Sequence, residues 1–352
     1  MSSKVLVTGG SGYLGTRLIA ALMRDGREVR ATVRSLDDET GVRAAVRRGG
    51  ADDAGLELVA ADLTSDDGWP SALEGVDEVH HVASPIPAAQ PKDADELIVP
   101  ARQGTLRVLK AARDVGARSV VLTSSFAAVG YSPKAVRDYA EADWTDPDTP
   151  GLAPYPRSKA IAERAAWDFI ANEGGDTQLV VVNPTFMAGP SLVRELRSTL
   201  TYFKSIIEGT MPLLPRQRFG VVDVRDVADA HIKAMATPFA AGKRYLLVAD
   251  GPTITWLGLA DHRHQRLLGP SAWAQQHLGA VDPSAQLGHV EFNRADSRVP
   301  GPGAVSVARV LSLARAFAVG GVALHRRLGT HDGLGEGAEH GPRQVGVAIG
   351  AF

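Results

Sequence analysis

The stretch VLVTGGSGYLG, residues Val5 to Gly15, decides the fold expected of this chain. A short apolar run at 5–8 reads as a buried strand, and the apolar spacing over 13–24 reads as a helix. Glycine between them permits a tight turn with positive φ and removes the Cβ that would block a pyrophosphate, while the helix N-terminus offers free N–H groups. The stretch therefore predicts a dinucleotide-binding loop, through Thr8, Gly9, Gly12 and Gly15 and the helix start at Tyr13 and Leu14.

The alternation of strand and helix continues to about residue 250. Continuous Val, Leu and Ala runs are typical of strands that are buried on both faces, and strands alternating with long helices indicate a parallel sheet. We expect an α/β fold, a Rossmann-type doubly wound sheet with a smaller C-terminal substrate lobe. The expected strands are 5–8, 28–33, 56–60, 78–83, 119–123 and 179–182, and the expected helices are 13–24, 97–115 and 156–172.

The chain divides into four expected regions. Residues 1–184 form the NAD(P)-binding core, 185–218 an insertion for the substrate lobe, and 219–250 a return to the core. Residues 251–352 form an atypical remnant or tail, because seven of the ten histidines lie there and strand-like runs vanish. One hypothesis is that the reading frame changes near Asp261, which would leave the substrate lobe incomplete; the alternative is a divergent tail.

Composition excludes several classes of protein. With 44% apolar residues, 22% charged residues and a net charge of −2, the chain is expected to be globular, with no nucleic-acid or membrane partner. It has no cysteine and no leader-like start, which favours the cytoplasm. The apolar segment 304–324 contains Arg309 and Arg315, so it is not expected to span a membrane.

No metal site is predicted. His80 and His81 are adjacent on an expected strand, so they point to opposite faces and are predicted to pack in the core. Asp223, Asp226 and Asp229 are spaced by three and are predicted to cap and solvate a helix.

The end of the second strand indicates which cofactor binds. An acidic residue there would bind a ribose 2′-hydroxyl, whereas EVRATVRS places Arg34 just past the strand and Arg30 within it. Arginine suits a 2′-phosphate through paired charge-assisted hydrogen bonds, so NADP is favoured. Asp37 and Asp38 keep NAD open. Asp62 and Leu63, after the third strand, are placed to contact the adenine, although a turn aspartate is an equally simple reading of Asp62.

The motif YPRSK places Tyr155 and Lys159 on one face of a helix, since residues i and i+4 share a face. A neighbouring ammonium favours the phenolate, and we expect it to lower the pKa of Tyr155 toward neutrality, together with the nicotinamide ring. Such a tyrosine could protonate a carbonyl oxygen as hydride arrives. The segment VVLTSSFAAVG supplies a hydroxyl at a strand end, from Ser125 or, one position earlier, Ser124.

Taken together, these motifs resemble the extended short-chain dehydrogenase/reductases, which include the NAD-dependent epimerase/dehydratase family. Within them the chain is most similar to the dihydroflavonol reductase-like branch of aldehyde, ketone and cinnamoyl-type reductases. The resemblance runs from Val7 to Met235 through VTGGSGYLG, VRATVRS, ADLTSDDGW, HHVASPIP, YPRSKAIAERAAWDF, VVNPTFMAGP and VVDVRDVADAHIKAM.

The resemblance implies a role for each matching position. Ser125 polarises the substrate carbonyl, Tyr155 donates the proton, and Lys159 binds the nicotinamide ribose and tunes Tyr155. The glycines bind the pyrophosphate and Arg34 the 2′-phosphate. The nicotinamide end is flanked by Ala83, Ser84, Pro184 and Thr185, and Thr123 is a further cofactor-binding residue. The substrate pocket is lined by Pro87, Phe126, Phe186 and Met187. Gln103 stands where the superfamily often has an asparagine of a proton relay.

The expected activity is NADP-dependent reduction of an aldehyde or ketone by a monomer or homodimer. Three alternatives stay open. A nucleotide-sugar epimerase or dehydratase would keep NAD tightly bound, a 3β-hydroxysteroid-type dehydrogenase would use the same residues, and a nucleotide-sensing module would bind without turnover. The substrate itself cannot be named from the sequence.

Overall fold

The computed structural model describes residues 3–85, 91, 93–133, 138–194, 200–201, 204–205, 218–249 and 254–255. The predicted pocket residue Pro87, the segment 304–324 and the proposed frame change near Asp261 lie outside the described residues.

Seven parallel strands form the central sheet, in the order β10-β6-β5-β4-β1-β2-β3. The strand order reverses between β1 and β4, and in open α/β sheets ligands bind at such a switch point, outside the carboxyl ends of the strands. The expected doubly wound sheet is confirmed. Its strands are β1 (Lys4–Thr8), β2 (Glu28–Val33), β3 (Glu57–Ala60), β4 (Glu78–His81), β5 (Ser119–Thr123), β6 (Gln178–Pro184) and β10 (Arg244–Leu247).

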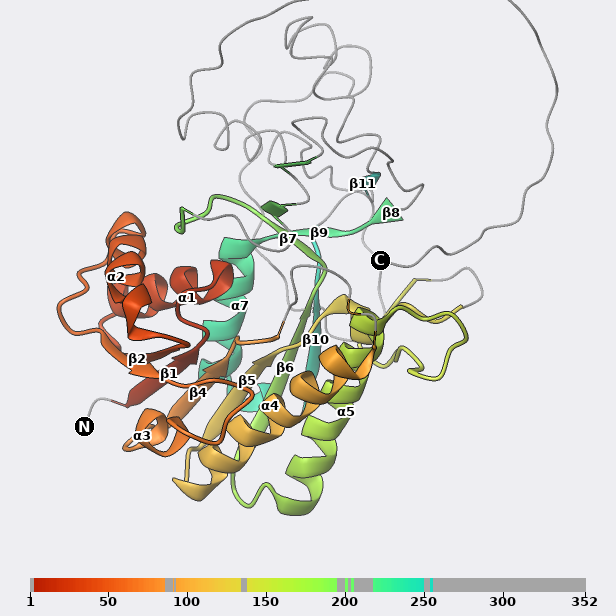
Figure 1. The fold of residues 1–352 in the computed structure, drawn as a ribbon, viewed down its shortest axis with the longest axis horizontal. Helices are drawn as coiled ribbons and strands as arrows, with labels where there is room; N and C mark the ends of the chain where they lie inside the picture. The colour runs from red at the N-terminus through yellow and green to blue at the C-terminus, as the bar shows by residue number, and fades with distance from the viewer. Residues whose placement is uncertain are drawn as a thin grey trace, which may run out of the picture.

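Helices cover both faces of the sheet (Figure 1). One face packs against α1 (Tyr13–Arg24), α2 (Glu39–Arg48) and α7 (Val224–Ala236), and the other against α3 (Trp69–Leu73), α4 (Asp95–Asp114) and α5 (Pro154–Glu173). Burial on both sides explains the continuous apolar strands, such as β5, in which every residue is buried.

Short elements complete the described chain. After β6 the chain leaves the main sheet, and β7 (Phe186–Ala188) pairs in parallel with β9 (Val221–Asp223). A second small sheet pairs β8 (Arg218–Phe219) with β11 (Ile254–Thr255). Single 3₁₀ turns are η1 (Leu36–Asp38), η2 (Phe126–Ala128) and η3 (Pro238–Ala240). Asp223 caps α7 by accepting a hydrogen bond from the Arg225 amide, as the aspartate spacing predicted.

Several element bounds differ from the sequence prediction by one or two residues, and one strand of the main sheet was missed. The fourth strand ends at His81 rather than at residue 83, because the amides of Val82 and Ala83 donate to the Thr8 hydroxyl instead of to a neighbouring strand. The strand β10 was not predicted at all. Its residues continue into the apolar run 245–249, so the sequence does carry a strand pattern there, although at this edge of the sheet three of its four residues are only partly buried.

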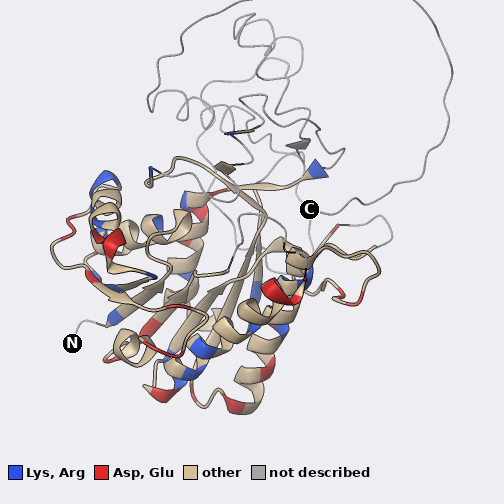
Figure 2. Ribbon diagram, in the orientation of Figure 1, with Lys and Arg blue, Asp and Glu red and all other residues tan. Residues whose placement is uncertain are grey.

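The charged side chains of the described residues are interspersed (Figure 2). In this view, positions with Lys or Arg and positions with Asp or Glu both occur along the outer helices. None of the helices in the described ranges has the length and apolar character needed to cross a membrane.

Three histidines are buried where β4 meets β5 and α7. His81 Nδ1 lies 2.8 Å from the Thr8 hydroxyl and His231 Nε2 lies 2.8 Å from the Thr123 hydroxyl. His80 packs edge-to-face on His231, and neither of its ring nitrogens has a hydrogen-bond partner among the described residues. Core packing of His80 and His81 is therefore confirmed. Burial lowers the pKa of His81 and of His231 to about 3 each, and puts the pKa of His80 well below its ordinary value.

These histidines predict loss of stability in mild acid. Their pKa values are depressed in the folded protein, so the unfolded chain takes up protons below about pH 6.5 while the native protein does not. Each histidine then removes about 1.4 kcal/mol of unfolding free energy per pH unit as the pH falls. His80→Leu removes one such group without breaking a hydrogen bond, so urea unfolding between pH 7 and pH 5 should show a shallower pH dependence. An unchanged slope would contradict a neutral, buried His80.

Candidate functional site

The glycine turn joins β1 to α1 and is shaped by contacts that only glycine permits. Gly9 has φ of +73°, and a Cβ on it would lie 3.0 Å from the Cα of Ala83. A Cβ on Gly15 would lie 2.2 Å from the Gly9 carbonyl oxygen. The Gly12 amide donates to the same oxygen at 2.9 Å, and the Gly10 amide donates to Thr32 O at 2.7 Å. The turn is thereby held against the ends of β2 and β4.

Thr8 fixes the β4 end of the site. Its hydroxyl accepts hydrogen bonds from the amides of Val82 and Ala83, each at 3.0 Å. Since two N–H groups already donate to it, its proton is available for the ring nitrogen of His81. The predicted cofactor residue Thr8 thus positions the backbone at Ala83, next to the glycine turn.

The turn fits a pyrophosphate. Gly12 is the N-cap residue of α1, and no side chain within the described ranges caps this helix, so its first N–H groups are available to an anion. A Cβ on Gly12 would meet only the Gly9 oxygen, at 3.1 Å, so the space beside it is open. Leu14 is buried in the core behind the turn. The phenol of Tyr13 donates to Gly189 O at 2.9 Å, which links the helix start to the segment after β7.

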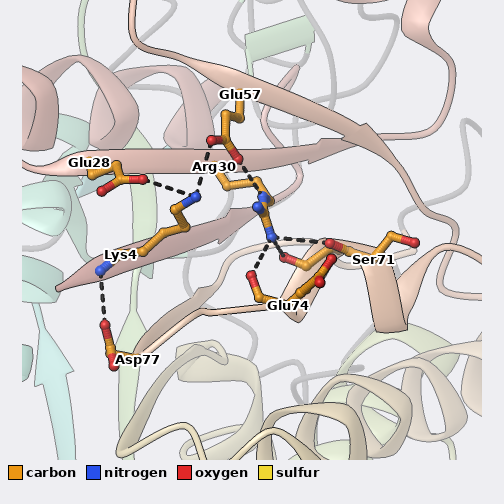
Figure 3. A network of polar contacts seen from close by, with 8 residues as sticks. Lys4, Glu28, Arg30, Glu57, Ser71, Glu74 and Asp77 are labelled. Atoms are coloured by element: carbon orange, nitrogen blue, oxygen red, sulfur yellow. Dashed lines mark hydrogen bonds and ion pairs between the residues drawn. The ribbon is translucent and has the colours of Figure 1, made fainter.

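The two candidate arginines of β2 differ (Figure 3). Arg30 pairs with Glu57 at 2.7 Å across the β2–β3 register, and it donates to the carbonyls of Ser71, Ala72 and Glu74 at 3.1, 3.2 and 2.8 Å. Lys4, from β1, joins the same Glu57 and also pairs with Glu28. The Arg30 guanidinium is therefore already bonded within this network, and Arg34 is the arginine assigned to the 2′-phosphate.

Arg34 remains available at the carboxyl end of β2. It is exposed, and it has no hydrogen-bond or ion-pair partner within the described part of the chain. Asp62 lies within reach of its charge: hydrogen bonds from Thr64, and to a lesser degree Arg34, lower the pKa of the Asp62 carboxyl. One oxygen of Asp62 accepts from both the amide and the hydroxyl of Thr64, as a turn aspartate does. Leu63 packs against Gly104 of α4.

Three predicted polar residues meet at the carboxyl edge of the sheet. Ser125, just past β5, lies with its Oγ 3.5 Å from the phenol oxygen of Tyr155, the outer limit of a hydrogen bond, and accepts from the Ala127 amide at 3.1 Å. Lys159, one turn along α5 from Tyr155, lies with Nζ 5.9 Å from the centre of the phenol ring. Its ammonium donates to the Ser84 hydroxyl at 2.9 Å. The segment after β4 is thus tied to α5.

The pKa of Tyr155 reflects two opposing effects. Burial raises it above the ordinary value, and the hydrogen bond with Ser125 lowers it by less. Burial also lowers the pKa of Lys159 to about 8, while Glu163 raises it. In the protein without a nicotinamide ring, burial of the phenol therefore outweighs the hydrogen bond that favours its ionised form. The expected lowering by Lys159 and the nicotinamide ring together stays a prediction. A proton donor must hold its proton, and the raised pKa keeps it.

Ser124 has a different task from Ser125. It is buried, and its hydroxyl donates to Glu163 Oε2 at 2.6 Å. The fallback assignment of the catalytic hydroxyl to Ser124 therefore has no geometric support, since only Ser125 faces Tyr155. Glu163 was missed as a separate residue by the sequence reasoning, although it lies inside YPRSKAIAERAAWDF. The sequence did contain a signal for it: a glutamate one helical turn after Lys159, on the face of the helix that the structure buries.

The remaining predicted residues lie in different surroundings. The Thr123 hydroxyl is bonded to His231, and Thr185 donates its amide and hydroxyl to Leu247 O, after Pro184 ends β6. Phe126 packs edge-to-face on Tyr131 and Tyr139. Phe186 and Phe219 lie with ring centres 5.1 Å apart, and Met187 packs against the core.

Gln103 does not lie with this group. It is exposed, and it lines a surface groove between α4 and α5 whose lining residues include neither Ser125 nor Tyr155. The structure therefore does not support a proton relay in which Gln103 is bridged by water to the Ser125 and Tyr155 group.

Comparison with known proteins places the chain among reductases. The model of the NAD dependent epimerase/dehydratase family matches residues 5–248. The chain is 36% identical over 253 residues to cinnamoyl-CoA reductase CAD2 of Medicago truncatula, covering 70% of this chain and 76% of that protein. It is 32% identical over 264 residues to an anthocyanidin reductase of Vitis vinifera, covering 70% and 77%.

A solved structure extends the likeness to three dimensions. Gre2 of Candida albicans, crystallised as a complex with NADPH, is 28% identical and superposes with a TM-score of 0.63, covering 76% of this chain and 83% of that one.

Proposed function

The chain belongs to the NAD-dependent epimerase/dehydratase family, and we propose that it reduces an aldehyde or ketone to the alcohol with NADPH. The observation that carries this proposal is the meeting of Ser125, Tyr155 and Lys159 at the edge of the sheet that also holds the glycine turn. The reductase relatives, one of them seen with NADPH, support it.

In this proposal each residue has one task. Bound NADPH supplies the hydride that reaches the carbonyl carbon. Tyr155 transfers its phenol proton to the carbonyl oxygen, and Ser125 donates a hydrogen bond to the same oxygen. Lys159 holds the cofactor's ribose near the phenol. The glycine turn, with Gly9, Gly12 and Gly15, binds the pyrophosphate, and Ala83, Ser84, Pro184 and Thr185 flank the nicotinamide end.

Three apolar side chains are the proposed substrate contacts. Phe126, Phe186 and Met187 would contact an apolar portion of the substrate, as aromatic and thioether side chains usually do. We place the substrate lobe at residues 185–218 and in the segment after 251.

The activity is tested by NADPH oxidation against a panel of aldehydes and ketones. We expect turnover of at least one carbonyl, with the alcohol identified as product. Absence of any turnover, together with NAD retained through purification, would point to an epimerase or dehydratase instead. NADPH binding without any turnover would point to a nucleotide sensor.

Arg34 is predicted to set the cofactor preference. Charge-assisted hydrogen bonds contribute about 1.5–3 kcal/mol, so Arg34→Ala should raise the Kd for NADPH by roughly 10- to 100-fold and change the Kd for NADH little. Titration calorimetry with both cofactors measures this. Arg102→Ala, an exposed arginine of α4, is the matched control. Equal changes for NADPH and NADH in the Arg34 variant would rule out a 2′-phosphate contact.

A further inference from the structure

Glu163 carries a buried negative charge that the reaction scheme above does not use. Its side chain, on α5, is fully buried and forms an ion pair with Arg244 of β10, with Nε 2.5 Å from Oε1. Replacing a buried ion pair by apolar residues is often neutral for stability. Stability alone therefore does not explain why this pair lies directly behind the proposed active site.

The second oxygen of Glu163 organises the residues around Ser125. It accepts from the Ser124 hydroxyl at 2.6 Å and from the Asn183 side-chain amide at 2.7 Å. The same amide group of Asn183 also donates to the Ser125 carbonyl oxygen at 3.2 Å. The two serines that follow β5 are thus both linked to the Glu163 carboxylate, Ser124 directly and Ser125 through the Asn183 side chain.

Arg244 is fixed in turn from the opposite side. Its Nη1 donates to the carbonyls of Glu141 and Asp143 at 2.7 and 2.8 Å. Its guanidinium lies 3.6 Å from the ring centre of Trp144. These contacts hold the arginine, and therefore the charge of Glu163, in one place.

We propose that Glu163 is a positioning residue of the reductase, which fixes the Ser125 loop and holds a carboxylate one helical turn from Lys159. Lys159 lies one turn before Glu163 on the same helix and is almost fully buried. The other groups close to it are Tyr155 on α5, whose phenol is neutral, and His81 on β4, which its burial keeps neutral. Glu163 is therefore the carboxylate that favours the ammonium form of Lys159. The positive charge of Arg244, paired with Glu163, reduces this effect. This inference rests on the proposed function, because it concerns the residues assigned there.

The test uses two variants that are expected to shift the pKa of Lys159 in opposite directions. In Glu163→Gln the pKa of Lys159 should fall further, so the alkaline limb of the kcat profile moves to lower pH, by on the order of one unit. In Arg244→Met the positive charge that offsets the Glu163 carboxylate is removed. The pKa of Lys159 should therefore rise, and the alkaline limb should move to higher pH. A purely structural role would lower the melting temperature in both variants without moving the limb in opposite directions. Glu173→Gln, an exposed glutamate at the end of α5, is the matched control and should leave the limb in place.

A second measurement keeps the inference testable if a single variant does not fold. Glu163→Gln leaves Arg244 buried without its partner, which is strongly destabilising, so the double variant Glu163→Gln/Arg244→Met removes both charges together. In protein labelled with [ε-¹³C]lysine and studied without NADPH, the Lys159 resonance, assigned by its loss in Lys159→Ala, reports the pKa directly.

The outcomes separate the two proposals. A lower pKa of Lys159 in Glu163→Gln or in the double variant supports the role of Glu163. An unmoved pKa and an unmoved alkaline limb overturn it, even if the wild-type protein reduces carbonyls. Absence of carbonyl reduction by the wild-type protein overturns the proposed function instead, and the resonance titration still decides how Glu163 acts on Lys159.

Discussion

Tyr155→Phe is expected to lower kcat for carbonyl reduction by about 10²–10⁴-fold, the usual range for loss of a positioned proton donor. The phenol is the group in the described chain that faces the Ser125 hydroxyl, and its raised pKa keeps the proton on it. Phenylalanine preserves the ring and its packing on α5. The Kd for NADPH should therefore stay within a few-fold of the wild-type value, so the loss appears in kcat and not in binding.

The control for this variant is Tyr131→Phe. Tyr131 packs on Phe126 and interacts electrostatically with Tyr155, but within the described part of the chain its hydroxyl makes no hydrogen bond with Ser125 or Lys159. Rate measurements under saturating NADPH should show near wild-type turnover for it. If Tyr155→Phe reduces carbonyls as fast as the wild-type protein, the proton comes from elsewhere and the assigned role fails.

Gly12→Val is expected to abolish tight NADPH binding while the protein stays folded. A Cβ at this position meets only the Gly9 oxygen, so the side chain extends into the space assigned to the pyrophosphate. Each charge-assisted hydrogen bond contributes about 1.5–3 kcal/mol, so losing two raises the Kd for NADPH roughly a hundredfold or more. Calorimetric titration gives the Kd, and thermal unfolding verifies the fold.

Gly15→Ala provides the contrast. Its Cβ would overlap the Gly9 carbonyl oxygen at 2.2 Å, so this variant should lose stability as well as binding. Gly41→Ala, on α2 with nothing within 4 Å of the new Cβ, should change neither. Unimpaired NADPH binding by folded Gly12→Val would place the pyrophosphate away from this turn.

The parts of the fold that follow from local pattern were predictable. The turn between β1 and α1 needs glycine at positions that a sequence shows directly, and strands buried on both faces appear as unbroken apolar runs. The helix Tyr13–Arg24 and the strand Ser119–Thr123 were predicted at their observed bounds. By contrast, Arg244–Leu247 was missed although an apolar run covers 245–249, and its place at the edge of the sheet is known only from its pairing with β6.

The site was predictable in its residue types and not in its electrostatics. Tyr155 and Lys159 share a helix face by spacing alone, but the sequence does not show how deeply the phenol is buried, and this burial raises its pKa in the protein without cofactor. The sequence shows Arg30 within the second strand, but only the strand register shows that Glu57 lies beside it. Glu163 and Arg244 are 81 residues apart, and only the sheet order brings them together.

The most direct test of the account is a crystal structure of the protein with NADPH and a slowly reduced carbonyl compound. The account predicts that the pyrophosphate lies on the turn from Gly9 to Gly15, and that the carbonyl oxygen accepts hydrogen bonds from both Tyr155 and Ser125. A pyrophosphate bound elsewhere, or a nicotinamide ring remote from Tyr155, would contradict it.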